Sequence, residues 1–269
     1  MASSFHIENF GCRAARADGE AIAALLRSSG AADTLPAEAD VVIVNTCSVT
    51  AEADREARAY IRRAHRLNPD ARIIATGCYA QRAPEELAAL SGVAAVIGNS
   101  HKALAPDIAL EWMALSYPPT TPLIQIQAAQ TTAAPQPVVL ADDSFAHSFL
   151  EEAPILPGAQ TRPNLKIQEG CGNRCTFCVI PQTRGSSRSL PAETVLRQVA
   201  GFVAAGGREL VLSGINLGRW GRDLQRRDRE LRSLPGLVRR LLEETGLPRL
   251  RLSSIEPMDW DDELIGLMR

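Results

Sequence analysis

The 269-residue sequence has no long apolar run and no large excess of charge of one sign. It has only four histidines. No stretch approaches the ~18 apolar residues of a membrane-spanning helix, and no basic flank with an apolar segment opens the chain as in a secretory signal. We therefore expect a cytoplasmic protein without a membrane partner. The net charge of −2 predicts neither nucleic-acid nor membrane binding, because binding depends on where charge lies. The 45% of apolar residues suffices for packed cores.

Cysteine is better represented, with six residues. In a reducing compartment such residues are more often metal ligands or catalytic groups than parts of a disulfide framework. All four histidines precede residue 150, so they offer no local partner to the cysteines of the second half.

Short β-rich runs alternate with helical stretches between residues 5 and 112. We expect strands at 5–11, 40–47 and 71–78, and helices at 18–29, 51–66 and 84–90. The run VVIV at 41–44 is apolar on both faces, which is typical of a strand in a parallel sheet covered by helices. Residues 1–114 are therefore predicted to form an open parallel α/β domain.

Proline then becomes frequent: the stretches 117–139 and 151–163 hold eight of the seventeen prolines. We interpret residues 115–162 as a Pro-rich linker in which 122–127 or 137–140 forms an edge strand. Alternation resumes in 163–269, with strands expected at 164–168, 209–215 and 250–255, and helices at 191–205, at 232–245 and from 261. This pattern predicts the opening half of a βα barrel or a layered sheet.

Three cysteines, Cys171, Cys175 and Cys178, follow the first strand of this second half with the spacing C-x3-C-x2-C. Gly170 and Gly172 leave the backbone free to wrap around a bulky group. Three thiolates suit an iron–sulfur cluster in which one iron keeps an open position, whereas a structural zinc site closes with four ligands. The alternative is a zinc knuckle that borrows a remote ligand.

The other three cysteines, Cys12, Cys47 and Cys78, each stand between a predicted strand and a helix. Because the carboxyl ends of parallel strands lie along one edge of a sheet, these cysteines are expected to converge in one crevice. The following helix N-termini would favour their thiolate forms. A second metal cluster is one interpretation, and three separate buried structural cysteines are the other.

The C-x3-C-x2-C loop after a first barrel strand resembles that of radical S-adenosylmethionine enzymes. The resemblance implies that Cys171, Cys175 and Cys178 hold a [4Fe-4S] cluster, and that S-adenosylmethionine binds the open iron and is cleaved to a 5′-deoxyadenosyl radical. It also implies that Phe177 packs near the adenine, although an ordinary core aromatic is equally compatible with the sequence.

Both cysteine triads together resemble the methylthiotransferase family. The resemblance rests on NTCSVTAEADREAR, ATGCYAQRAPEEL, IGNSHK, LKIQEGCGNRCTFCVIPQTRG and SRSLPAETVLRQV. It implies a second [4Fe-4S] cluster on the first triad, a role for that cluster in sulfur delivery, and an electron donor such as flavodoxin or ferredoxin.

The segments from 209–224 and 250–265 resemble the branch that methylthiolates N6-threonylcarbamoyladenosine beside the tRNA anticodon. The alternatives are the isopentenyladenosine branch, the branch that modifies an aspartate of a ribosomal protein, and a non-catalytic iron–sulfur protein. By this resemblance, five strand-end residues line the S-adenosylmethionine or substrate pocket: Gly214, Asn216, Ser253, Ser254 and Glu256. Turn and capping roles would explain the same residue types.

Two features depart from the family pattern. Ala15 stands where the family usually has asparagine, while Asp18 and Glu20 still match. The sequence also ends after only the third expected barrel strand, so we expect a fragment or a truncated gene product that does not methylthiolate tRNA alone. Eight arginines and three acidic residues lie between Arg219 and Arg240, with Trp220 among them. This patch could grip phosphate and stack on a base, or be a solvated surface.

Overall fold

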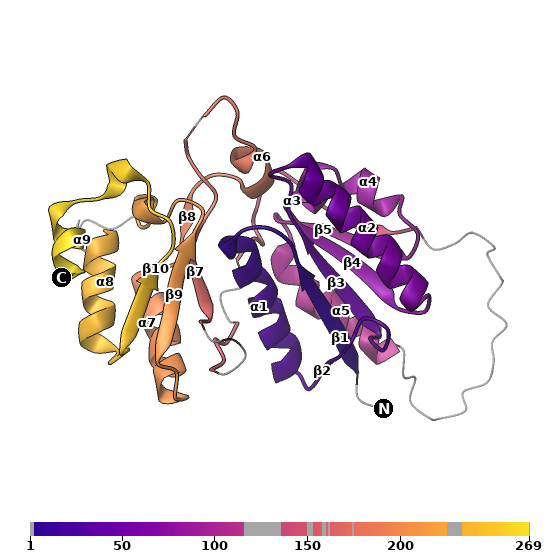
Figure 1. Cartoon of the computed structure of the whole chain (residues 1–269), viewed down its shortest axis with the longest axis horizontal. Coiled ribbons are helices and arrows are strands. Elements are labelled where there is room, and N and C mark those ends of the chain that lie inside the picture. The colour runs from indigo at the N-terminus through magenta and orange to yellow at the C-terminus, as the bar shows by residue number, and fades with distance from the viewer. Residues whose placement is uncertain are drawn as a thin grey trace.

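The computed structural model of the chain contains two sheets, one in each half (Figure 1). It describes residues 3–115, 136–149, 153–157, 160, 162–173, 175–224 and 233–268. Helix α1 lies between the two sheets and contacts strands of both. Residues that are distant in the sequence therefore meet where the halves face each other.

The first sheet has the strand order β2-β1-β3-β4-β5-β6, and its paired strands are all parallel in the described part of the chain. The strands are β1 (Ser4–Asn9), β2 (Ala32–Asp33), β3 (Val41–Thr46), β4 (Arg72–Gly77), β5 (Val93–Gly98) and β6 (Val138–Leu140). Asn9 is paired with Asn45, and Thr46 with Gly77, so the carboxyl ends of β1, β3 and β4 are nearly level.

Helices cover both faces of this sheet, as the apolar run of β3 predicts. Val41 and Ile43 pack toward α1 (Arg13–Ser28) and α5 (Ala105–Leu115). Val42 and Val44 pack toward the other layer. That layer consists of α2 (Ala51–Leu67), α3 (Cys78–Arg82) and α4 (Pro84–Ala88). The open parallel α/β prediction is confirmed.

Some elements differ from the sequence-based expectation. Helix α1 begins at Arg13, five residues earlier than expected, because small alanines at its start are buried against the sheet. Neither β5 nor α5 was expected, since the short apolar run of β5 has no periodicity that separates a strand from a helix. Strand β6 confirms an edge strand within 137–140, whereas 122–127 lies outside the described residues.

The second sheet has the order β10-β9-β7-β8. Its strands are β7 (Asn164–Glu169), β8 (Arg188–Ser189), β9 (Glu209–Gly214) and β10 (Arg249–Leu252). β10, β9 and β7 are parallel as expected, and the two-residue β8 pairs antiparallel with β7. The helices of this half are α6 (Ile180–Arg184), α7 (Ala192–Ala204), α8 (Leu234–Glu244) and α9 (Asp262–Leu267). Its 3₁₀ turns are η2 (Leu217–Arg219) and η4 (Pro257–Asp259), and the turn η1 (Lys102–Leu104) belongs to the first half.

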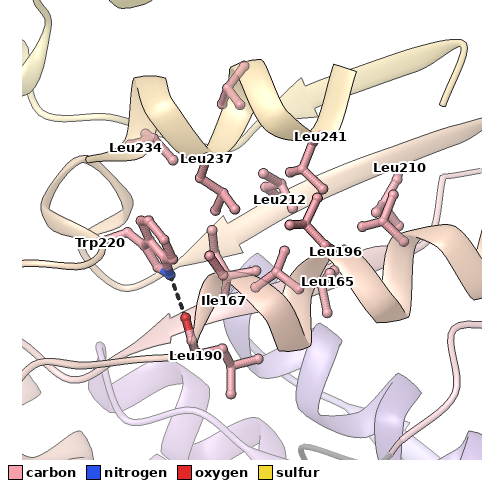
Figure 2. Close-up of a cluster of buried hydrophobic side chains, with 14 of the residues drawn as sticks. Leu165, Ile167, Leu190, Leu196, Leu210, Leu212, Trp220, Leu234, Leu237 and Leu241 are labelled. Carbon is pink, nitrogen blue, oxygen red and sulfur yellow. Dashed lines mark hydrogen bonds between the residues drawn. The ribbon is translucent and has the colours of Figure 1, made fainter. Parts of the chain in front are cut away.

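Alternate residues of the second sheet build its core on one face (Figure 2). Leu165 and Ile167 of β7 and Leu210 and Leu212 of β9 pack against α7 and α8. Each fully buried leucine of this kind contributes about 1.5–3 kcal/mol to stability. The opposite face carries the buried polar residues of β7 and lies toward α1.

Two candidate cysteine sites between the halves

The first cysteine triad lies at the carboxyl edge of the first sheet. Cys12 is the N-cap of α1, Cys47 follows β3, and Cys78 is the first residue of α3. The thiol of Cys47 is close enough to those of Cys12 and Cys78 for their charges to act on it. The structure thus brings the three to one edge, as the strand pattern predicts.

Gly11 shows how tightly this edge is built. Its backbone has φ +98°, and a Cβ placed on it would lie 2.6 Å from the Cβ and 2.7 Å from the Sγ of Cys47. Only glycine allows the Cys12 loop to approach Cys47 this closely. The cradle and its three thiols suit a sulfur-ligated group.

The pKa of the Cys47 thiol is raised overall, although the backbone at the start of the following helix acts in the expected direction. Burial raises the pKa of the Cys47 thiol, and the neighbouring Cys78 and Cys12 raise it further, while a hydrogen bond from the backbone N–H of Val49 lowers it. The backbone at the start of the following helix is therefore outweighed by desolvation.

Cys78 receives hydrogen bonds from both halves of the molecule. Asn99, just after β5, donates through Nδ2 to Cys78 Sγ at 3.4 Å and to the Thr183 carbonyl at 2.8 Å. Arg184, at the end of α6, donates through Nε to Cys78 Sγ at 3.2 Å. The first triad is thus in direct contact with the segment that follows the second triad.

The second triad lies in the loop between β7 and α6. Cys171 and Cys178 are half-buried and Cys175 is exposed. The N–H of Cys171 donates to the Gly185 carbonyl at 3.0 Å, which ties the start of the loop to the end of α6. Gly170, with φ +69°, precedes it, and a Cβ there would overlap the Ser186 carbonyl oxygen. Three free thiols in an open loop fit the donor set of an iron–sulfur cluster.

Neither cysteine triad has the close spacing of ligands around a single metal ion in the described part of the chain. Within the described residues, no three His, Cys, Asp or Glu side chains form a group that could hold a metal ion. The cysteines' assignment as cluster ligands therefore stays a prediction.

Five buried charged side chains join the halves next to the first triad. These residues, which we term the interface charge network, are Asp18, Lys102, Lys166, Glu169 and Arg184. All have side chains no more than 6% exposed. Asp18 contacts all three cations, with its Oδ2 2.7 Å from Lys102 Nζ and 3.3 Å from Arg184 Nη1.

The ion pairs of the network keep its two carboxylates charged. Burial alone would raise the pKa of Glu169, but Arg184, Lys102 and Lys166 hold it well below its ordinary value. Burial lowers the pKa of Lys102 to about 8, against the opposing effect of Asp18 and Glu169. Both carboxylates are consequently ionised at neutral pH, and the network spans residues of both halves.

The sequence is similar to known proteins in both halves of the chain. A model of a family described as uncharacterized protein family UPF0004 matches residues 4–98. The chain is 36% identical, over 98% of its length, to the threonylcarbamoyladenosine tRNA methylthiotransferase MtaB of Bacillus subtilis, of which it covers 54%. It is 37% identical, over 83% of its length, to the ribosomal protein uS12 methylthiotransferase RimO of Chloroflexus aurantiacus, of which it covers 49%.

The chain is thus similar to methylthiotransferases over most of its length. It spans about half the length of the curated relatives it matches. Its fold is similar to that of the radical S-adenosylmethionine methyltransferase TsrM of Kitasatospora setae, a structure with cobalamin and a [4Fe-4S] cluster bound. The TM-score is 0.55 at 15% identity, and the match covers the whole chain and 57% of TsrM.

The predicted pocket residues differ in how deeply they are buried. Asn216 is buried and lies beside the cysteine loop, with Nδ2 3.6 Å from Cys171 Sγ. Gln168 Oε1 holds it there by accepting a hydrogen bond from the Asn216 N–H at 2.6 Å. Gly214 ends β9 directly against Gln168. This close packing joins the ends of β7 and β9 beside Cys171.

The remaining predicted residues are more open. Ser253 is half-buried, and its Oγ has no partner among the described residues, whereas Ser254 and Glu256 are exposed. Phe177 is 92% exposed, so its interpretation as a core aromatic was wrong. Its contact with an adenine stays a prediction.

The family residues near Cys12 have clear structural positions. Ala15, where an asparagine was expected, is buried, and its carbonyl accepts a hydrogen bond from Asn45 Nδ2 at 2.6 Å. Asp18 belongs to the interface charge network. Glu20 accepts hydrogen bonds from the N–H and Nδ2 of Asn164, both at 3.2 Å, and so fastens α1 to the start of β7.

Sequence reasoning did not single out Asn99, Lys102 or Arg184. Each lies in a segment that carries the family resemblance, IGNSHK or LKIQEGCGNRCTFCVIPQTRG. The signal was therefore present, but their roles emerge only where the two segments meet.

The proposed stacking role of Trp220 was wrong. Its side chain is 1% exposed, and Nε1 donates to the Leu190 carbonyl at 3.0 Å (Figure 2). The arginines of this segment that the structure describes all have acidic partners: Arg219 and Arg222 pair with Asp259, Arg239 with Glu263, and Arg240 with Glu193 and Glu244. The patch's other arginines lie outside the described residues, so its phosphate binding stays a prediction.

No helix in the described part of the chain is both long enough and apolar enough to cross a membrane.

Proposed function

We propose that this chain acts in the methylthiolation of tRNA, as the cluster-bearing part of an enzyme that adds a 2-methylthio group to N6-threonylcarbamoyladenosine. The observation that carries the proposal is the hydrogen bond from Arg184, six residues after the second triad, to Cys78 of the first triad. The named activity of the MtaB relatives, 33–36% identical over most of this chain, supports the nucleoside.

Within this function, Cys171, Cys175 and Cys178 would hold one [4Fe-4S] cluster and Cys12, Cys47 and Cys78 a second. When bound, the cluster of the second triad would supply the electron that cleaves S-adenosylmethionine, and a donor such as flavodoxin or ferredoxin would reduce that cluster.

The chain's own residues would hold S-adenosylmethionine beside the loop. Asn216 Oδ1 is buried without a partner among the described residues, although Nδ2 of the same side chain is near Cys171. A buried acceptor without a partner is costly, so a bound ligand with N–H or O–H groups would satisfy it. Ser253 Oγ offers a second such group at the end of β10.

A ribosomal protein is the second candidate substrate. The chain is 37% identical to the RimO protein of Chloroflexus aurantiacus, over 83% of its length against 98% for the MtaB protein of Bacillus subtilis. A non-catalytic iron–sulfur protein is the third candidate, which cleavage of S-adenosylmethionine would exclude.

The deciding experiment is mass spectrometry of tRNA nucleosides from cells with and without the full-length gene. Deletion should abolish the 2-methylthio form of N6-threonylcarbamoyladenosine, while the nucleoside without the methylthio group accumulates, since its C2–H bond would no longer be replaced. Ribosomal protein uS12 and the isopentenyladenosine nucleosides from the same cells are the controls. Loss of the methylthio group from either control alone would contradict the proposed substrate.

A further inference from the structure

The interface charge network carries one more positive than negative charge. Three cations, Lys102, Lys166 and Arg184, face two carboxylates, Asp18 and Glu169, which leaves a net charge of 3 − 2 = +1. A buried charge without a counterion is strongly unfavourable. The network therefore calls for one further anion at its border.

Arg184 is the member that reaches this border. Its Nη1 pairs with Glu169 Oε1 at 2.7 Å and Asp18 Oδ2 at 3.3 Å, while its Nε donates to Cys78 Sγ at 3.2 Å. Its side chain is fully buried, and Nη2 has no hydrogen-bond partner among the described residues. Nη1 of the guanidinium thus pairs with the carboxylates of the network, while Nε faces the sulfur of Cys78.

Lys102 provides a natural comparison. It is equally buried and also pairs with Asp18 and Glu169, but its third contact is Asn99 Oδ1 at 3.1 Å rather than a cysteine. The two cations differ in their contact with sulfur, while both lie within the same network. A direct effect on a sulfur-ligated group should therefore come from Arg184.

We infer that Arg184 is a positioning residue that sets the reduction potential of the cluster held by Cys12, Cys47 and Cys78. The inference rests on the proposed function, which places a cluster there. Adding an electron makes a cluster more negative, so a cation that donates a hydrogen bond to a ligand sulfur stabilises the reduced form. Because Arg184 follows Cys178 by six residues, the loop of the radical site positions the residue that controls the other site.

The test is a redox titration followed by electron paramagnetic resonance. The full chain is reconstituted with Cys171, Cys175 and Cys178 replaced by alanine, so that only the first triad holds a cluster. Arg184→Met should lower the ratio of reduced to oxidised cluster at a given potential about tenfold, which is a negative shift of about 59 mV for one electron. Lys102→Met, the matched control, should shift the ratio by less than about threefold.

A second variant covers failure of Arg184→Met to fold or to retain its cluster. Arg184→Lys keeps the charge but cannot contact both Glu169 and Cys78 with a guanidinium fork, and it should lower the ratio about threefold. Equal shifts for Arg184→Met and Lys102→Met, or no shift for Arg184→Lys, would overturn the inference alone. A chain with native cysteines that binds no cluster at the first triad would contradict the proposed function as well.

Discussion

Replacing Glu169 with alanine is expected to lower the free energy of unfolding by about 3–5 kcal/mol, because the change leaves three buried cations with one carboxylate. Urea unfolding of the wild-type and variant chains at pH 7 measures the difference. Glu244→Ala is the control: Glu244 is paired with Arg240 at the surface, so its loss should change the free energy of unfolding little.

The difference in unfolding free energy between wild type and Glu169→Ala should depend on pH. Folding lowers the pKa of Glu169 from an unfolded value near 4.5, so its contribution is fully present above that pH. The contribution is lost as the pH falls toward the pKa of the folded state. The stability difference between wild type and Glu169→Ala should therefore narrow below pH 4.5. A loss at pH 7 no larger than that of Glu244→Ala would show that the network does not join the halves energetically.

Replacing Cys175 with alanine is expected to abolish reductive cleavage of S-adenosylmethionine, whereas Cys47→Ala should largely retain it. The reason is that the two residues belong to separate triads, on the C-x3-C-x2-C loop and at the end of β3. Chromatography of 5′-deoxyadenosine formed anaerobically with a chemical reductant measures the reaction. Thr176→Ala, a non-ligand change in the same loop, should behave as wild type.

Equal loss of cleavage in the Cys47→Ala and Cys175→Ala chains would indicate a single shared site. Cleavage of S-adenosylmethionine by the Cys175→Ala chain would show that the reaction does not need the cysteine loop.

The fold was largely predictable because its signals are local. The apolar run VVIV of β3 indicates a strand covered on both faces, and a strand end before each cysteine of the first triad indicates a common edge. The interface charge network could not be predicted in this way. Its Arg184 contact to Cys78 joins residues 106 apart, and single charged residues carry no periodicity that reports such a meeting.

The role of Trp220 was predicted wrongly for a different reason. An indole among arginines is compatible with stacking on a base, but it is equally compatible with a core anchor whose N–H needs one acceptor. The acceptor is the Leu190 carbonyl, which the chain supplies thirty residues earlier, just after β8. The two-residue strand β8 has too few residues for any sequence pattern, so neither it nor the pocket for Trp220 was predictable.

The most direct test of the central claim, two three-cysteine cluster sites in one chain, is iron and sulfide analysis after anaerobic reconstitution. Two [4Fe-4S] clusters correspond to about eight iron and eight sulfide per chain, falling to about half in both Cys47→Ala and Cys175→Ala and to a value near zero in the double variant. A colourless chain that binds zinc in place of iron, with no sulfide, would contradict the claim.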